Sequence, residues 1–185
     1  VGSQSAYWVV LADKALISGK RGRFCIIDFR SHRLPRIARS SCAVESYGFE
    51  EGIDAANVVR GQYAELLGHR CRSSKDWHAV IDEVPLVGVV DARDAHDRVR
   101  SDVSATTGAQ KSLSFCVAAL RQVFRSAAAT LRWTHTENMV VDGMTKQMDV
   151  SHLCRIVLGG VWSIEYEPSM MKASSRALKR AEKAQ

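Results

Sequence analysis

The sequence has little proline, no closely paired cysteines and no long apolar run, and each shortage excludes a class of protein. Three prolines and 12 glycines among 185 residues exclude collagen-like and proline-rich low-complexity chains. No apolar run approaches the ~18 residues that a membrane-spanning helix needs. The best candidate, residues 84–90, has only the length of a strand. Residues 1–5 show no basic segment followed by an apolar one, so no secretory signal peptide is visible and we expect no membrane partner.

Cysteine usage indicates a reducing environment. The five cysteines are odd in number, widely spaced and without a CxxC pair, which argues against a zinc ribbon and against a disulfide framework. Most stand among apolar residues, so we interpret them as reduced structural thiols. The expected location is therefore intracellular, in a cytoplasmic particle or the nucleus, and not secreted.

What the chain does contain is typical of a globular domain. Hydrophobic residues make up 46% and charged residues 25%, which argues against wholesale disorder. A chain of this length buries roughly 70% of its unfolded surface. The net charge of +6 permits a polyanionic partner without requiring one. The first residue is Val1 rather than methionine, which we interpret as the mark of an excised or truncated piece.

The first half of the chain predicts a hairpin, a long helix and a buried strand. Aromatic and β-branched residues at 7–12 and 24–29, separated by a glycine-containing turn at 18–22, indicate an antiparallel hairpin. Serines at 40–41 precede apolar residues at helical spacing as far as residue 67. The apolar run at 84–91 suits a strand that is buried on both faces.

The second half alternates helices and strands. We expect helices over 92–100, 109–129, 137–148 and 150–158, and strands over 130–134 and 161–166. The fold class is therefore α/β, with a mixed sheet that opens with an antiparallel hairpin. We assign residues 1–166 to one domain and residues 167–185 to a basic tail.

Three carboxylates stand at points where such a fold places functional groups. Glu45 lies in the first turns of the long helix, Asp91 ends the buried strand, and Asp142 lies in the helix predicted after Trp133. Each has an ordinary alternative, as a complement to the helix dipole, a turn residue or a solvated side chain. Together they are oxygen ligands of the kind that Mg²⁺ prefers. Two such ions, roughly 3.5–4 Å apart, activate water and stabilise the leaving oxygen in phosphodiester hydrolysis.

These residues also carry a resemblance to a known family. The segment SSCAVE at 40–45 resembles the Ser-Ser-x-x-x-Glu opening of the first helix in ribonuclease H domains of copia-type retrotransposon polyproteins. The strand ending VVD at 89–91 resembles the strand that ends in the family's Cys-Asp-Asn. The segment TENMVVDGMTK at 136–146 is similar to the family's Thr-Glu-x-x-x-Ala-Asp-x-Leu-Thr-Lys and is the most specific of the three. Order and spacing agree over about residues 5–148.

The resemblance implies a ribonuclease H-like fold and a metal-dependent endonuclease that cuts the RNA strand of an RNA–DNA hybrid. It implies two Mg²⁺ or Mn²⁺ ions held by Glu45, Asp91 and Asp142, and the reverse transcriptase domain of the same polyprotein as a partner. The hybrid would be held by its backbone in a basic groove, with 2′-hydroxyl contacts distinguishing RNA from DNA. Arginines between the hairpin and the long helix are the candidate nucleic-acid contacts: Arg30, Arg33, Arg36 and Arg39.

Two further polar residues are auxiliary candidates. Asn138 matches an asparagine of cellular ribonucleases H, although a polar residue at a helix N-terminus is an ordinary occurrence. His135 precedes that helix, where a histidine assists product release, although its spacing to Asp142 is shorter than in the cellular enzymes.

The chain departs from the family at its beginning. The family carries a fourth carboxylate on a first, central strand, and this chain starts at the turn that would follow it. We therefore expect a fragment or a decayed copy with a weakened metal site and unpaired sheet edges. The alternative function is a catalytically inactive remnant that binds nucleic acid or packs against a polymerase domain. A third reading, an α/β domain of unknown ligand, gains ground if the three carboxylates lie far apart.

Overall fold

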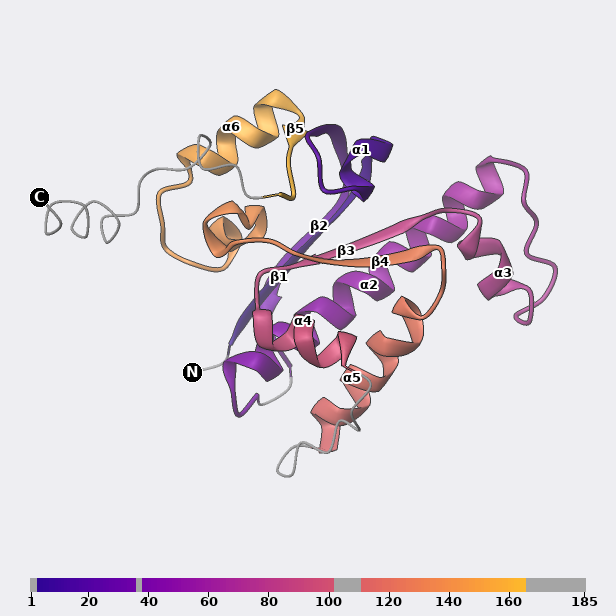
Figure 1. The fold of residues 1–185 in the computed structure, drawn as a ribbon, viewed down its shortest axis with the longest axis horizontal. Helices are drawn as coiled ribbons and strands as arrows, with labels where there is room; N and C mark the ends of the chain where they lie inside the picture. Colours follow the sequence, from indigo (N-terminus) through magenta and orange to yellow (C-terminus); the bar gives the residue numbers. More distant parts are fainter. Residues whose placement is uncertain (1–2, 36–37, 102–110, 166–185) are drawn as a thin grey trace, which may run out of the picture.

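The computed structural model describes residues 3–35, 38–101 and 111–165, except for the side chain of His152. Within these ranges the chain is mixed α/β, as predicted, with two small sheets and helices packed around them (Figure 1). The predicted loop beyond Ser101, residue Arg36 and the predicted tail lie outside the described residues.

The N-terminal sheet is built on the predicted hairpin. Strands β1 (Gln4–Ala12) and β2 (Gly22–Arg33) pair antiparallel, with a register shift between Val9 and Val10. The connection contains a short helix, α1 (Lys14–Ile17), and Gly19 takes a positive φ of 85° in the turn that follows. The short strand β5 (Val161–Trp162) pairs with the first residues of β2.

Helix α2 (Ser41–Leu66) confirms the long helix that the sequence predicts. Its N-cap is Ser40, whose side-chain oxygen accepts a hydrogen bond from the backbone N–H of Ala43 at 3.2 Å. Gly48 and Gly52, one turn apart, bring the helix against β1. A Cβ at Gly48 would overlap the hydroxyl of Ser5, and one at Gly52 would stand 3.0 Å from the Cβ of Tyr7. These glycines therefore set how closely α2 approaches the hairpin.

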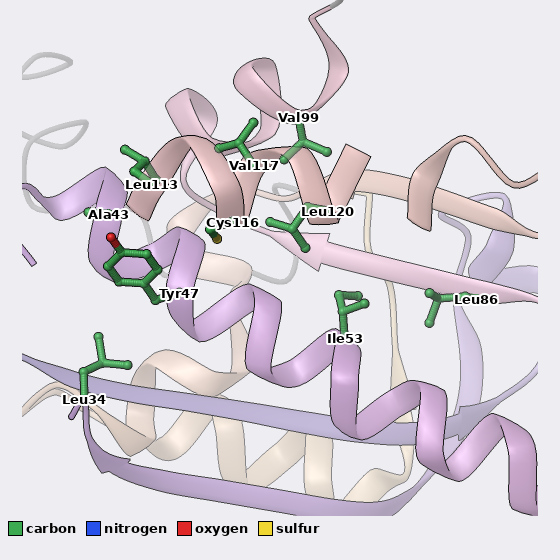
Figure 2. Packing of buried hydrophobic residues seen from close by; sticks show 10 residues of the cluster. All are labelled: Leu34, Ala43, Tyr47, Ile53, Leu86, Val99, Leu113, Cys116, Val117 and Leu120. Carbon is green, nitrogen blue, oxygen red and sulfur yellow. The ribbon is translucent and has the colours of Figure 1, made fainter. Parts of the chain in front are cut away.

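The second sheet consists of the parallel strands β3 (Leu86–Val90) and β4 (Ala129–Trp133). Helices α4 (Arg93–Arg100) and α5 (Lys111–Phe124) form the crossover between them, and α3 (Trp77–Asp82) precedes β3 in a segment without a predicted element. The central core lies between α2, α5 and β3 (Figure 2). Its buried members are Leu34, Ala43, Tyr47, Ile53, Leu86, Val99, Leu113, Cys116, Val117 and Leu120.

The prediction of a helix over residues 137–148 is wrong. The chain there forms two 3₁₀ turns, η1 (Thr136–Asn138) and η2 (Val140–Met144), and the next helix is α6 (Ser151–Gly159). The side chain of Asn138 donates to the backbone carbonyl of Ser163 at 2.8 Å and to the Thr134 hydroxyl at 2.9 Å. These bonds tie the turn back to the residues after β5, which local helical spacing does not reveal.

Antiparallel and parallel strand pairs are both present, as expected of a mixed sheet. The described strands form two separate sheets, however, with no hydrogen bonds between them. The five cysteines are free, but Cys25 and Cys154 are exposed and only Cys116 is buried, so most of them are not core residues. Among the described residues, no helix has the length and apolar character needed to cross a membrane.

Candidate metal centre

The three predicted carboxylates come from different parts of the fold and meet at one cavity. Glu45 lies in the second turn of α2, Asp91 directly follows β3, and Asp142 lies in η2. All three line the same cavity, which has a volume of about 480 Å³. Asp142 is the most buried, with 7% of its surface exposed.

Glu45 is electrostatically coupled to the other two. Burial raises the pKa of the Glu45 carboxyl, and repulsion from Asp91 and Asp142 raises it further, while the Lys146 ammonium acts in the opposite direction. The net shift is upward. Asp91 and Asp142 follow Glu45 by 46 and 97 positions in the sequence, yet both lie near enough for their charges to interact with it.

Asp142 is paired with the ammonium of Lys146. Burial raises the pKa of its carboxyl, the hydrogen bond from Lys146 lowers it, and the charge of Asp91 raises it again, with a net upward shift. The ammonium of Lys146 lies 2.7 Å from Asp142 Oδ2. Burial would lower the pKa of Lys146, but Asp142, Asp91 and Glu45 outweigh it and the pKa is raised. Lys146 therefore neutralises part of the cluster.

The η2 turn that carries Asp142 is fixed to the hairpin through Met144. The indole N–H of Trp8 donates to the Met144 sulfur at 2.6 Å, and the hydroxyl of Ser31 donates to the Met144 carbonyl at 2.8 Å. Asp142 is thus positioned by β1 and β2, whereas Asp91 is positioned by β3.

The three carboxylates have the chemistry that a hard divalent cation prefers, but their side chains are not spaced as a metal site in this structure. Three partly buried carboxylates whose charges repel one another are stabilised by a bound cation, and oxygen is the ligand that Mg²⁺ and Mn²⁺ prefer. Yet no group of three or more His, Cys, Asp or Glu side chains in the described ranges has the arrangement of a metal site. Lys146 supplies the positive charge there instead.

Of the candidate nucleic-acid arginines, the three in the described ranges, Arg30, Arg33 and Arg39, do not line the cavity of the carboxylates. Arg30 is engaged by Glu51, with its guanidinium 2.9 Å from Glu51 Oε1, and the other oxygen of Glu51 lies 3.1 Å from His32 Nε2. Arg33 and Arg39 are exposed at the end of β2 and before α2. Arg36 lies outside the described residues.

The two auxiliary candidates lie outside the cavity that the carboxylates line. Asn138 is buried, and its amide is used in the hydrogen bonds to Thr134 and Ser163. His135 is half-buried, with its Nδ1 accepting from the Glu137 N–H at 3.3 Å and its ring 6.2 Å from that of Trp133 in an edge-on arrangement.

Lys146 is the member of the cluster to which the sequence pattern assigned no role. Its signal is the four-residue spacing from Asp142, the spacing at which opposite charges meet across one turn of a helix. The pair forms here although residues 142–146 are not α-helical, since η2 ends at Met144.

Comparison with known proteins gives no independent assignment: no family model matches the chain, and no significantly similar curated protein or solved structure was found.

Proposed function

We propose that the chain is the ribonuclease H-like domain of a copia-type retroelement, a metal-dependent endonuclease that cuts the RNA strand of an RNA–DNA hybrid. The observation that carries the proposal is the meeting of Glu45, Asp91 and Asp142 at one cavity with interacting charges. These three residues were identified from sequence motifs alone, so their common position at one cavity is independent support. Had they been scattered, the reading as an α/β domain of unknown ligand would have been favoured.

Glu45, Asp91 and Asp142 are the residues that would hold Mg²⁺ or Mn²⁺. The ions supply activation of a water molecule and stabilisation of the leaving oxygen of a phosphodiester. The chain's own contribution is to position the carboxylates from α2, β3 and η2 and to keep Asp142 largely buried. Partial burial strengthens the attraction of these carboxylates for a cation, because the local dielectric is lower than in water.

A second function, nucleic-acid binding without catalysis, is favoured by a specific observation. The Asp142 carboxylate already forms a salt bridge with Lys146. Among the described residues, no three His, Cys, Asp or Glu side chains are arranged as metal ligands. An inactive remnant of the same family would keep the fold and a hybrid-binding surface but lose the metal. The exposed Arg33 and Arg39 are its candidate phosphate contacts, and the reverse transcriptase domain of the same polyprotein its candidate protein partner.

The test is cleavage of a 5′-labelled RNA–DNA hybrid in Mg²⁺ and in Mn²⁺. It uses this chain and the chain extended upstream in its encoding sequence, each beside the variants Asp91→Asn and Asp94→Asn. Asp94 is exposed on α4, three residues along, and is the matched control. Cutting that is lost in Asp91→Asn and kept in Asp94→Asn supports the enzyme. Hybrid binding without cutting, in both lengths of chain, supports the inactive remnant and excludes the enzyme.

A further inference from the structure

A second cavity, of about 490 Å³, lies where helices α4 and α5 meet strand β4 (Figure 1). It shares no lining residue with the cavity of the carboxylates. Within the described ranges, no acidic side chain lines it. Its volume is in the range of sites that hold small molecules. Four arginines line it: Arg100 from α4, Arg121 and Arg125 from the end of α5, and Arg132 from β4.

Hydrogen bonds to backbone carbonyls position two of these arginines. The guanidinium of Arg121 donates to the carbonyl of Arg98 in the last turn of α4, at 3.0 Å from Nε and 2.7 Å from Nη2. The Nε of Arg132 donates to the carbonyl of Ile17 at 2.8 Å. The backbone N–H of Arg125 donates to the carbonyl of Arg121 at 3.0 Å, so the helical turn continues to this residue. Side chains four residues apart lie on one face of a helix, which brings Arg121 and Arg125 together.

The cavity carries an excess of positive charge. Within the described ranges, no carboxylate forms an ion pair with Arg100, Arg125 or Arg132. The carboxyl-terminal ends of α4 and α5 each supply a partial negative charge of about one half. Three full charges against two halves leave an excess of about two positive charges. Like charges held close together repel, so an anion in the cavity would stabilise the folded chain.

Strand β4 adds a backbone donor at its outer edge. The N–H of Thr134 donates to the carbonyl of Val90, and Leu131 stands opposite Gly88 in the parallel register. In this register the N–H groups of alternate residues point to opposite edges of the strand, so the N–H of Leu131 points away from β3. Among the described strands, none pairs with that edge. Leu131 lines the cavity, and a backbone N–H is a further donor for a phosphate oxygen.

We propose that this cavity binds a compact anion with linked phosphate groups, either a free oligophosphate or the triphosphate of a nucleotide. Guanidinium groups pair with phosphate oxygens through two parallel hydrogen bonds. Because the arginines come from three elements, they suit an anion that concentrates several charges in a small volume. A nucleic-acid backbone spreads its charges along a strand and suits a long groove better than a recessed cavity. The proposal does not depend on the nuclease function.

The probe is sodium triphosphate, titrated into the full chain by isothermal titration calorimetry. The buffer contains EDTA, which removes divalent cations and with them any metal-mediated binding at the carboxylates. The variants are Arg100→Gln and Arg125→Gln, whose side chains are both exposed. The control is Arg98→Gln, which removes the same charge from α4 at an exposed residue that does not line the cavity. Sulfate at the same ionic strength is the control anion, and circular dichroism establishes that each variant is folded.

We expect saturable binding of triphosphate to the unaltered chain and to Arg98→Gln. Affinity should be at least about tenfold weaker for each of the other two variants, because each loses charge-assisted hydrogen bonds. Hydrogen–deuterium exchange of the unaltered chain should show new protection at residues 98–101 and 121–132, and this measurement decides the matter if a variant does not fold. Titration with ATP distinguishes the two sources: tighter binding than that of triphosphate indicates a nucleotide, and equal or weaker binding indicates a free oligophosphate.

Absence of saturable binding overturns the proposal. So does an equal loss of affinity in Arg98→Gln, or sulfate binding as tight as that of triphosphate, because either result would reflect the net charge of the chain alone. If triphosphate does not bind but both cavity variants weaken binding of an RNA–DNA hybrid, these arginines contact a nucleic-acid backbone and the proposal is wrong.

Discussion

The ammonium of Lys146 lies 2.7 Å from a carboxylate oxygen of Asp142, four residues earlier in the chain, and carries the positive charge of a cluster with three negative charges. The backbone between them bends through η2, where the N–H groups of Thr145 and Lys146 both donate to the carbonyl of Asp142. This bend, rather than a regular helix, brings the two side chains together. Lys146 thus competes with any cation that binds at Asp142.

Replacing Lys146 by glutamine should therefore make the chain more dependent on divalent cations. Without metal, the melting temperature should fall, because three carboxylates then repel one another with less compensation. In Mn²⁺ the gain in melting temperature should exceed that of the unaltered chain, since ligand binding to the folded state stabilises it. Thermal denaturation with and without Mn²⁺ measures both effects. Lys111→Gln, at the exposed start of α5, is the control, and an equal Mn²⁺ response in the two variants contradicts the competition.

Glu45→Gln should stabilise the chain at neutral pH. The folded pKa of Glu45 is raised, mainly by burial and then by Asp91, so the folded state binds its proton more tightly than the unfolded state does. Ionised Glu45 therefore opposes folding above its folded pKa. As the pH falls through the folded pKa towards the unfolded value, that opposition disappears and the advantage of the variant should vanish. Urea unfolding at neutral and acidic pH measures the difference, with Glu65→Gln, exposed on the same helix, as the control. A constant difference at both pH values is the contrary result.

Ser40→Ala should lower the free energy of unfolding by about 1 kcal/mol, because the Ala43 N–H loses its acceptor at the start of α2. Ser41→Ala, one residue along and exposed, should change it by less than about 0.5 kcal/mol. Chemical denaturation of the two variants side by side is the measurement. Equal losses would show that the cap does not depend on the Ser40 hydroxyl.

Asn138→Ala should cost about 1–3 kcal/mol, because it leaves the buried Ser163 carbonyl and Thr134 hydroxyl with fewer partners. The expected defect is in stability, since this amide holds the turn after β4 against the residues after β5. Gln147→Ala, exposed nearby, should stay within about 0.5 kcal/mol of the unaltered chain. A destabilisation no larger than that of the control would remove the structural role assigned to Asn138.

Local patterns predicted the elements whose neighbours lie close in sequence. The hairpin, α2 with its serine cap, α4 and the buried stripe of α5 at Leu113, Val117 and Leu120 all follow from spacing and capping. The helix predicted after β4 does not form, because the hydrogen bonds of Asn138 to distant residues override the helical spacing of the local sequence. Helix α3 went unpredicted because it is only six residues long.

The sequence predicts which carboxylates belong to the candidate site, but not how the surrounding side chains are arranged. Motif resemblance selected Glu45, Asp91 and Asp142, and the fold brings them to one cavity. The pairing of Lys146 with Asp142 depends on a bend that the sequence pattern described as helix. Arg30 pairs with Glu51 because α2 packs against the β1–β2 hairpin, a tertiary contact that no local sequence pattern predicts.

The separation of the two sheets has a thermodynamic consequence. Asp91 directly follows β3, whereas Asp142 is tied through Met144 to the hairpin. A cation bound by both carboxylates would therefore connect the two sheets. Its binding free energy would be added to the stability of the folded chain, because the unfolded chain does not bring these carboxylates together.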